Sequence, residues 1–259
     1  MAAKWGKDDL TGFYDAANEE ALNTLAQLPA AHEALLEIDQ AFRHFLTHDT
    51  PMTDPAIPAL LGINAQSMLL AACRTAMSGH AVPTYVLLRG CLESALYSLH
   101  MIKNPKAEVV WLDRGKSSAA SEACRTEFSA GRVKRTASET NEGLGSYVAD
   151  AYEALLDFGA HPNVGGVMRH VRRHEGESAK VELAILHGHG PRKAEALVAC
   201  IEVGLAALVA LVEAFPERAK GIGLDAVVQK IFEQRAATIE VIKRQTIGPE
   251  TAVSDCFGR

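Results

Sequence analysis

Apolar residues return at helical spacing along most of the chain. Between Leu10 and Leu25, and again between Leu35 and Leu46, they recur every three or four residues with acidic or polar residues between them. This is the pattern of an amphipathic helix. Gly79 is suited to the left-handed conformation that ends many helices. The same reasoning predicts further helices at about 59–78, 83–104, 105–112, 146–159, 191–215 and 224–245.

Three segments depart from this pattern. Residues 48–58 contain three prolines and are expected to form a loop. Residues 115–145 are rich in Ser, Ala, Thr and charge, which indicates a polar helix with frayed parts. Between 166 and 187 the runs VMRHVRRH and KVELAIL flank EGESA, and the second run is short, contains β-branched residues and is bounded by turn formers, which predicts a β-hairpin.

The expected fold class is therefore all-α, or mainly α. We predict a multi-helix bundle with a small inserted β-hairpin near residues 166–187. No shift in composition marks a domain boundary, so residues 1–247 are expected to form a single helical domain with the hairpin as an insertion. Residues 248–259 show no periodicity and are expected to be a mobile C-terminal tail.

Composition and charge narrow the class of protein. Of the 259 residues, 48% are hydrophobic and 22% are charged, which is typical of a soluble globular protein. The formal net charge of -6 disfavours a dedicated nucleic-acid-binding protein. The five cysteines are scattered, so buried reduced thiols are expected. The N-terminus has no apolar signal segment, and the most apolar run, 203–212, is too short to span a membrane. We therefore expect a cytoplasmic protein with no membrane partner.

One charged pair lies inside a helix with strong core character. Arg89 and Glu93 are four residues apart, so they share a helix face. Apolar residues cover most of the circumference of this helix, which places the pair at a core edge or in a cleft. It could be an internal ion pair that fixes helix packing, because a buried charge needs a partner. It could instead line a pocket for a polar ligand. His100 lies near the same stripe and is expected to cap the helix C-terminus.

Histidines cluster later in the chain. His161 follows the helix-ending Gly159, where Asp157 and Asn163 could orient its ring. No metal-ligand spacing accompanies the histidines of this region, so neither a metal nor another cofactor is expected. The segment RHVRRH also fits the loose pattern of Arg and His separated by four residues that helical HEPN ribonucleases use, but here the pattern lies on a predicted strand. As a strand, the segment would present a weak basic patch of Arg169, Arg172, Arg173 and His174.

Two of these stretches together resemble a known family. LLRGCLESALYSLHMIKNP and, some sixty residues later, YEALLDFGAHPN are similar to an uncharacterised, mainly helical bacterial family with an Arg-x-x-x-Glu helix and a later Tyr…His-Pro segment. Its members are sometimes discussed beside HEPN-like and abortive-infection proteins. The resemblance covers roughly residues 59–186. It implies that Arg89, Glu93, Tyr152 and His161 are the matching positions, and it implies no activity.

The sequence thus supports three hypotheses of function. The first is a binding or regulatory protein, in which Arg89, Glu93 and His161, with Tyr152, line a polar cleft for a small polar or anionic ligand. The second is a HEPN-like, metal-independent ribonuclease of the phage-defence or toxin type, in which Arg clamps a phosphate and His is the acid–base; only this hypothesis calls for RNA as a partner. The third is a purely structural protein whose apolar helix face pairs two copies into a homodimer.

Overall fold

The structure is a computed structural model that describes residues 5–48, 56–174 and 180–246; for residues 172–174 and 180–182 it describes the backbone alone. Helices form nearly all of it. The elements, in chain order, are α1 (Asp9–Gln27), α2 (Pro29–Thr47), α3 (Ala56–Met77), α4 (Ala81–Lys103), α5 (Lys106–Leu112), η1 (Asp113–Gly115), α6 (Ser118–Glu127), α7 (Ala130–Thr140), α8 (Glu142–Leu155), η2 (Leu156–Ala160), α9 (Val164–Met168), β1 (Val171–His174), β2 (Lys180–Leu183), α10 (Pro191–Ala214), α11 (Pro216–Gly221) and α12 (Leu224–Thr246).

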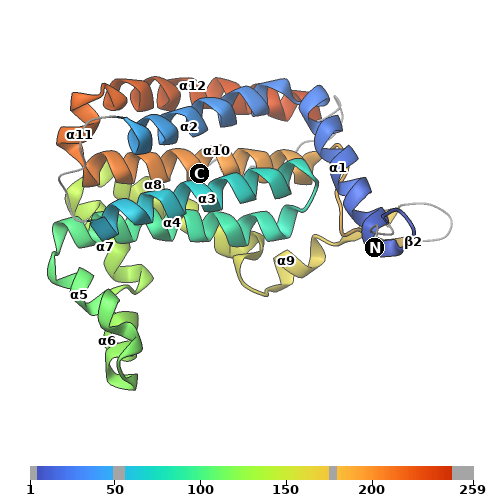
Figure 1. The fold of residues 1–259 in the computed structure, drawn as a ribbon. Helices are drawn as coiled ribbons and strands as arrows, with labels where there is room; N and C mark the ends of the chain where they lie inside the picture. Colours follow the sequence, from blue (N-terminus) through green and yellow to red (C-terminus); the bar gives the residue numbers. More distant parts are fainter. Residues whose placement is uncertain (1–4, 49–55, 175–179, 247–259) are drawn as a thin grey trace.

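Helix α10 is the central element of the bundle. It packs against α2, α3, α4, α8 and α12, and it runs between α12 and α2 on one side and α3 and α4 on the other (Figure 1). Its sequence is dominated by Ala, Leu and Val, and most of its residues are buried. Small side chains let neighbouring helices approach closely, because a Cβ atom on Gly204 would lie 3.1 Å from both Ile38 and Leu69. The helix that is apolar on all sides is thus the one that the others cover.

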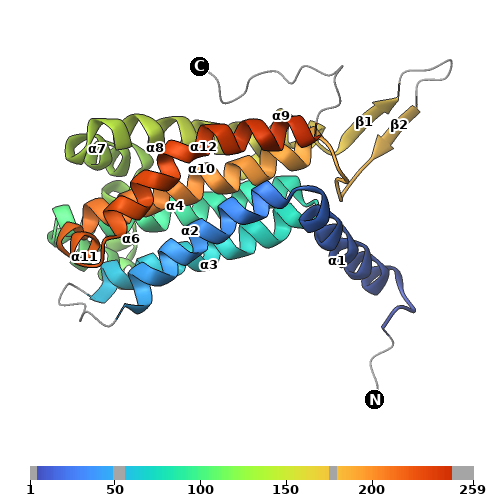
Figure 2. The ribbon, with the colours of Figure 1, turned by 90° about the horizontal axis from the view of Figure 1, so that it is seen from above.

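Two parts of the chain extend away from this bundle. Helices α5 and α6 project below it in Figure 1, while α1 and the two strands lie at the opposite end, as Figure 2 shows. The buried His100 joins the projecting part to α4, because its Nδ1 contacts Thr136 Oγ1 at 2.7 Å and its Nε2 contacts Glu127 Oε1 at 3.1 Å. The expectation that His100 caps α4 is therefore wrong: its ring is buried between α4 and the α6–α7 region.

The mainly α fold class is confirmed, with changes at several element boundaries. The polar region 115–145 contains two separate helices, α6 and α7, and α3 begins three residues earlier than expected. The β-hairpin expected at 166–187 is not confirmed, because Val164–Met168 is helical and only two strands of four residues each lie in the described part of this region. The strands pair antiparallel with Val171 opposite Leu183. The segment between the strands and the expected tail at 248–259 lie outside the described residues.

A backbone contact closes the end of the bundle near α1. Gly79 follows α3 with φ of 84°, the left-handed conformation that its position after a helix predicts. The backbone N–H of the buried His187 donates a hydrogen bond to the carbonyl oxygen of Gly79 at 2.8 Å. The segment that leaves β2 is thereby attached to the turn between α3 and α4, just before α10 begins.

The core also contains long apolar helices and free thiols. Helices α3 and α10 are each long and apolar enough to cross a membrane, with 39% and 78% of their most apolar windows buried in the fold, and core helices pass the same test. Of the five cysteines, the four in the described residues are free thiols, as expected, and Cys91, Cys124 and Cys200 are buried. Burial raises the pKa of the Cys91 and Cys200 thiols, which keeps them protonated.

Candidate functional site

Arg89 and Glu93 lie at the edge of the core on the middle of α4. Their side chains are 24% and 28% exposed, and Arg89 Nε donates a hydrogen bond of 2.8 Å to Glu93 Oε1. Partial burial alone would lower the pKa of Arg89, but the hydrogen bond and charge of Glu93 outweigh it, so the pKa is raised. The pair is thus half-buried and charged, at the core edge that the sequence predicts.

Tyr152, on α8, attaches this pair to the next helix. Its buried hydroxyl donates a hydrogen bond of 2.7 Å to Glu93 Oε1, and its ring centroid lies 5.4 Å from Arg89 Cζ. Burial, and then the hydrogen bond to Glu93, raises the pKa of Tyr152 to about 12. The phenol therefore keeps its proton at neutral pH, and Glu93 accepts from both neighbours.

A π-helical turn, η2, ends α8 and sets the position of the following loop. Phe158 in this turn stacks on Tyr85 of α4, with ring centroids 5.4 Å apart. Arg169 Cζ lies 4.1 Å from the centroid of Phe158, and its guanidinium also pairs with Glu195 at 2.7 Å. Because Tyr85 is one helical turn before Arg89, this stacking holds η2 beside α4 within about one helical turn of Arg89. π-helical turns occur often at functional sites.

His161 leaves η2 directly toward Arg89. Gly159 permits this exit because its φ of 124° is a conformation that residues with a side chain rarely adopt. A Cβ atom at this position would also lie 2.9 Å from Val82. The exposed ring of His161 contacts Arg89 through Nε2 and Nη1. A guanidinium only donates hydrogen bonds, so Nε2 of His161 is the acceptor in this contact. Asn163 does not orient this ring; its side chain bonds the backbone at Leu156 and Gly166.

The structure therefore brings together all four residues of the predicted cluster: Arg89, Glu93, Tyr152 and His161. The predicted basic patch is separate. Arg169 caps α9 rather than lying on a strand, and it is engaged with Phe158 and Glu195. The side chains of the other three patch residues lie outside the described part of the structure: Arg172, Arg173 and His174.

One residue of the site is not predicted from the sequence. The ammonium nitrogen of Lys134, on α7, lies 5.3 Å from the centroid of the Tyr152 ring. The composition of this region predicts a polar, partly frayed helix and no site. The helical spacing of the buried Val133 and Ala137 is the signal that could have identified α7 and placed Lys134 beside its packed face.

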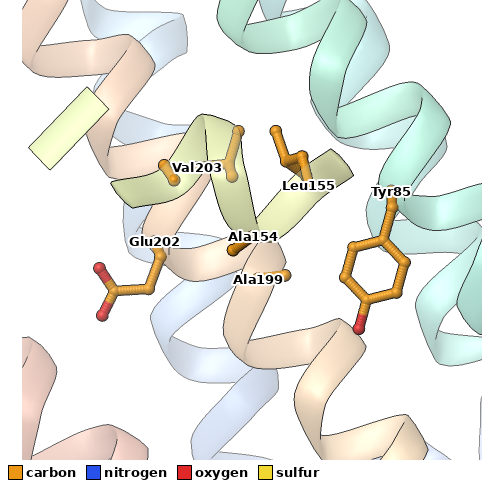
Figure 3. Close-up of a pocket in the computed structure, with 7 residues that line it drawn as sticks. Tyr85, Ala154, Leu155, Ala199, Glu202 and Val203 are labelled. Atoms are coloured by element: carbon orange, nitrogen blue, oxygen red, sulfur yellow. The ribbon is translucent and has the colours of Figure 1, made fainter. Parts of the chain in front are cut away.

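A small cavity elsewhere is not a rival ligand site. It lies between α4, α8 and α10 (Figure 3) and measures about 10 Å³, room for no more than one water molecule. Its walls are mainly apolar, and the Arg89 cluster does not line it. In the described part of the chain, no group of three His, Cys, Asp or Glu residues is arranged to hold a metal ion.

Comparison with known proteins gives no further identification: no protein-family model, curated protein or solved structure matches this chain. The family resemblance described above therefore stays a prediction. The case for a function rests on the geometry of the cluster itself.

Proposed function

We propose that the Arg89 cluster binds a small anionic ligand, and that the chain is a cytoplasmic binding or regulatory protein. The contact between the Arg89 guanidinium and the exposed His161 imidazole carries this proposal. An internal ion pair is complete with Glu93 alone and needs no imidazole on its other side. An anion at this edge would accept hydrogen bonds from the guanidinium, whose five N–H groups exceed its two side-chain hydrogen bonds.

The other residues of the cluster fit this role. Glu93 holds the Nε edge of Arg89, and Tyr152 in turn holds Glu93, so the guanidinium is oriented before a ligand arrives. A pre-oriented donor loses little conformational entropy on binding. Because Arg89 is partly buried, the effective dielectric constant around it is lower than in water, which strengthens its attraction for an anion.

Titrating the protein with inorganic phosphate, sulfate and acetate in a calorimeter tests the proposal. At least one of these anions is expected to bind, and Arg89→Gln is expected to weaken its binding about tenfold or more, since a charge-assisted hydrogen bond contributes roughly 1.5–3 kcal/mol. Arg43→Gln is the matched control, because Arg43 pairs with Asp39 through Nε at 2.6 Å, also four residues apart, but its side chain is 60% exposed.

Two results would contradict the proposal. If none of the anions binds and Arg89→Gln only lowers the stability of the fold, the Arg89–Glu93 pair is structural and fixes α4 against α8. If the protein cleaves mixed RNA and His161→Ala abolishes the cleavage, the ribonuclease hypothesis replaces it. The contact between Arg89 and Nε2 counts against that second result, because it occupies one of the two ring nitrogens that could take up a proton.

A further inference from the structure

Lys134 extends the cluster with a second cation from a different helix. Its side chain is half-buried beside Tyr152, the same ring that Arg89 approaches. Lys116 and Lys193 each pair with a carboxylate. In the described part of the chain, no Asp or Glu oxygen lies within 4.0 Å of the ammonium nitrogen of Lys134. A tyrosine ring attracts a cation but leaves its charge in place. The cluster therefore carries an ammonium group that an anion could neutralise.

The charges of the cluster do not balance. Arg89 and Lys134 are cationic side chains, and Glu93 is the single carboxylate that contacts Arg89 in the described structure. One positive charge is left over in a half-buried setting, where water compensates it less well than at the open surface. A bound anion would restore the balance.

The stretch of chain that includes Lys134 is rich in positive charge. Between residues 103 and 135 there are eight Lys and Arg residues against four Asp and Glu, in a chain whose formal net charge is -6. Tyr97, on the turn of α4 after Glu93, lies near enough to Arg114 of η1 for the arginine to oppose the rise that burial and Glu93 cause in its pKa. Residues 103–135 are thus basic within an acidic protein, which favours the approach of anions to this part of the chain.

We propose that the ligand is a phosphate-bearing molecule, and that Lys134 binds its phosphate group together with Arg89; this inference rests on the proposed function. The cations come from α4 and α7 and lie 5.4 Å (Arg89 Cζ) and 5.3 Å (Lys134 Nζ) from the centroid of the Tyr152 ring, and the His161 ring comes from a third segment. A tetrahedral phosphate presents oxygens in several directions and can contact donors from separate helices at once. A carboxylate presents two oxygens in one plane and suits a single guanidinium.

Calorimetric titration with inorganic phosphate and with acetate tests this assignment on the full chain. Phosphate is expected to bind about tenfold tighter than acetate. Lys134→Met is expected to weaken phosphate binding about tenfold, while the flexible Met side chain still packs on Tyr152. Lys134→Arg keeps the charge and is expected to restore binding. Lys116→Met is the control, because it removes the same charge from an exposed lysine that pairs with Asp113 at 2.6 Å.

The outcomes separate this inference from the proposed function. If Arg89→Gln weakens both anions, phosphate is not preferred and Lys134→Met changes neither, the phosphate assignment is overturned and anion binding stands. If Lys116→Met weakens phosphate as much as Lys134→Met does, the effect is one of net charge, and the contact is also overturned. If neither anion binds the unsubstituted protein, both proposals fail. A loss confined to Lys134→Met and Arg89→Gln supports the assignment.

Discussion

Replacing Glu20 with leucine is expected to lower the free energy of unfolding by about 2–3 kcal/mol at pH 7. Glu20, on α1, pairs with the ammonium group of Lys193 at the start of α10, whose side chain is only 1% exposed. Thr24 Oγ1 accepts a second hydrogen bond from this ammonium at 2.7 Å. Without Glu20, a buried charge would remain with one neutral partner, which is costlier than having no charge there.

A double substitution tests this explanation. The pair Glu20→Leu with Lys193→Met is expected to lie within about 1 kcal/mol of the unsubstituted protein, because both charges are removed together. Asp39→Leu is the control; it breaks the exposed Arg43–Asp39 pair and should cost less than about 1 kcal/mol. Urea unfolding gives the free energy of unfolding of the unsubstituted protein, Glu20→Leu, the double variant and Asp39→Leu. A cost below about 1 kcal/mol for Glu20→Leu alone would mean that water reaches the ammonium.

The same lysine makes stability depend on pH. Burial lowers the pKa of Lys193 to about 8 in the folded protein, below its ordinary value of 10.5. Between these values the unfolded chain holds a proton that the folded chain has released, so the free energy of unfolding rises with pH. The rise is at most about 1.4 kcal/mol per pH unit, and it is absent below pH 8, where both states are protonated. Lys193→Met should remove this part of the profile.

Replacing Gly79 with alanine is expected to cost about 2–4 kcal/mol. A left-handed backbone costs a residue with a Cβ roughly 1–2 kcal/mol. The added Cβ would also lie 2.4 Å from the carbonyl oxygen of His187 and 2.9 Å from its nitrogen, which is backbone and cannot rotate away. The His187 segment must move, and its hydrogen bond to Gly79, worth roughly 0.5–1.5 kcal/mol, is strained or lost.

Gly188→Ala provides the comparison in the same segment. A Cβ atom on Gly188 meets nothing within 4 Å, so this substitution should change stability by less than about 0.5 kcal/mol. Urea unfolding curves of the two variants give the difference directly. Equal stabilities for Gly79→Ala and Gly188→Ala would show that the segment before α10 yields easily and does not close the end of the bundle.

The helices were predictable because their cause is local. The spacing of apolar residues located the helices of the bundle, and the apolar run 203–212 became part of the buried helix α10. The same spacing placed Arg89 and Glu93 on one stripe at the core edge. The failures occurred where tertiary contacts decide the structure. His100 has a capping position in sequence, yet Thr136 and Glu127 draw it into the interior.

The site was predictable only in part for the same reason. The family resemblance selected Tyr152 and His161, but nothing local shows that His161 meets Arg89. That contact depends on the π-turn of η2 and on Phe158 stacking against Tyr85, which are 73 positions apart in the chain. Lys134 was not predicted because α7, the helix that carries it, is short and polar. The orientation of α7 follows from packing against α8 rather than from the spacing of its own apolar residues.

The separation of the site residues along the chain has a thermodynamic consequence. Arg89, Lys134 and His161 come together only when α4, α7 and η2 are docked, so an anion that bridges them finds no equivalent site on the unfolded chain. Such a ligand stabilises the fold by mass action, by about 2.7 kcal/mol at a concentration one hundred times its Kd. The melting temperature of the protein therefore reports on the occupancy of this cluster, and a collection of phosphate compounds can be ranked by it before any biological activity is known.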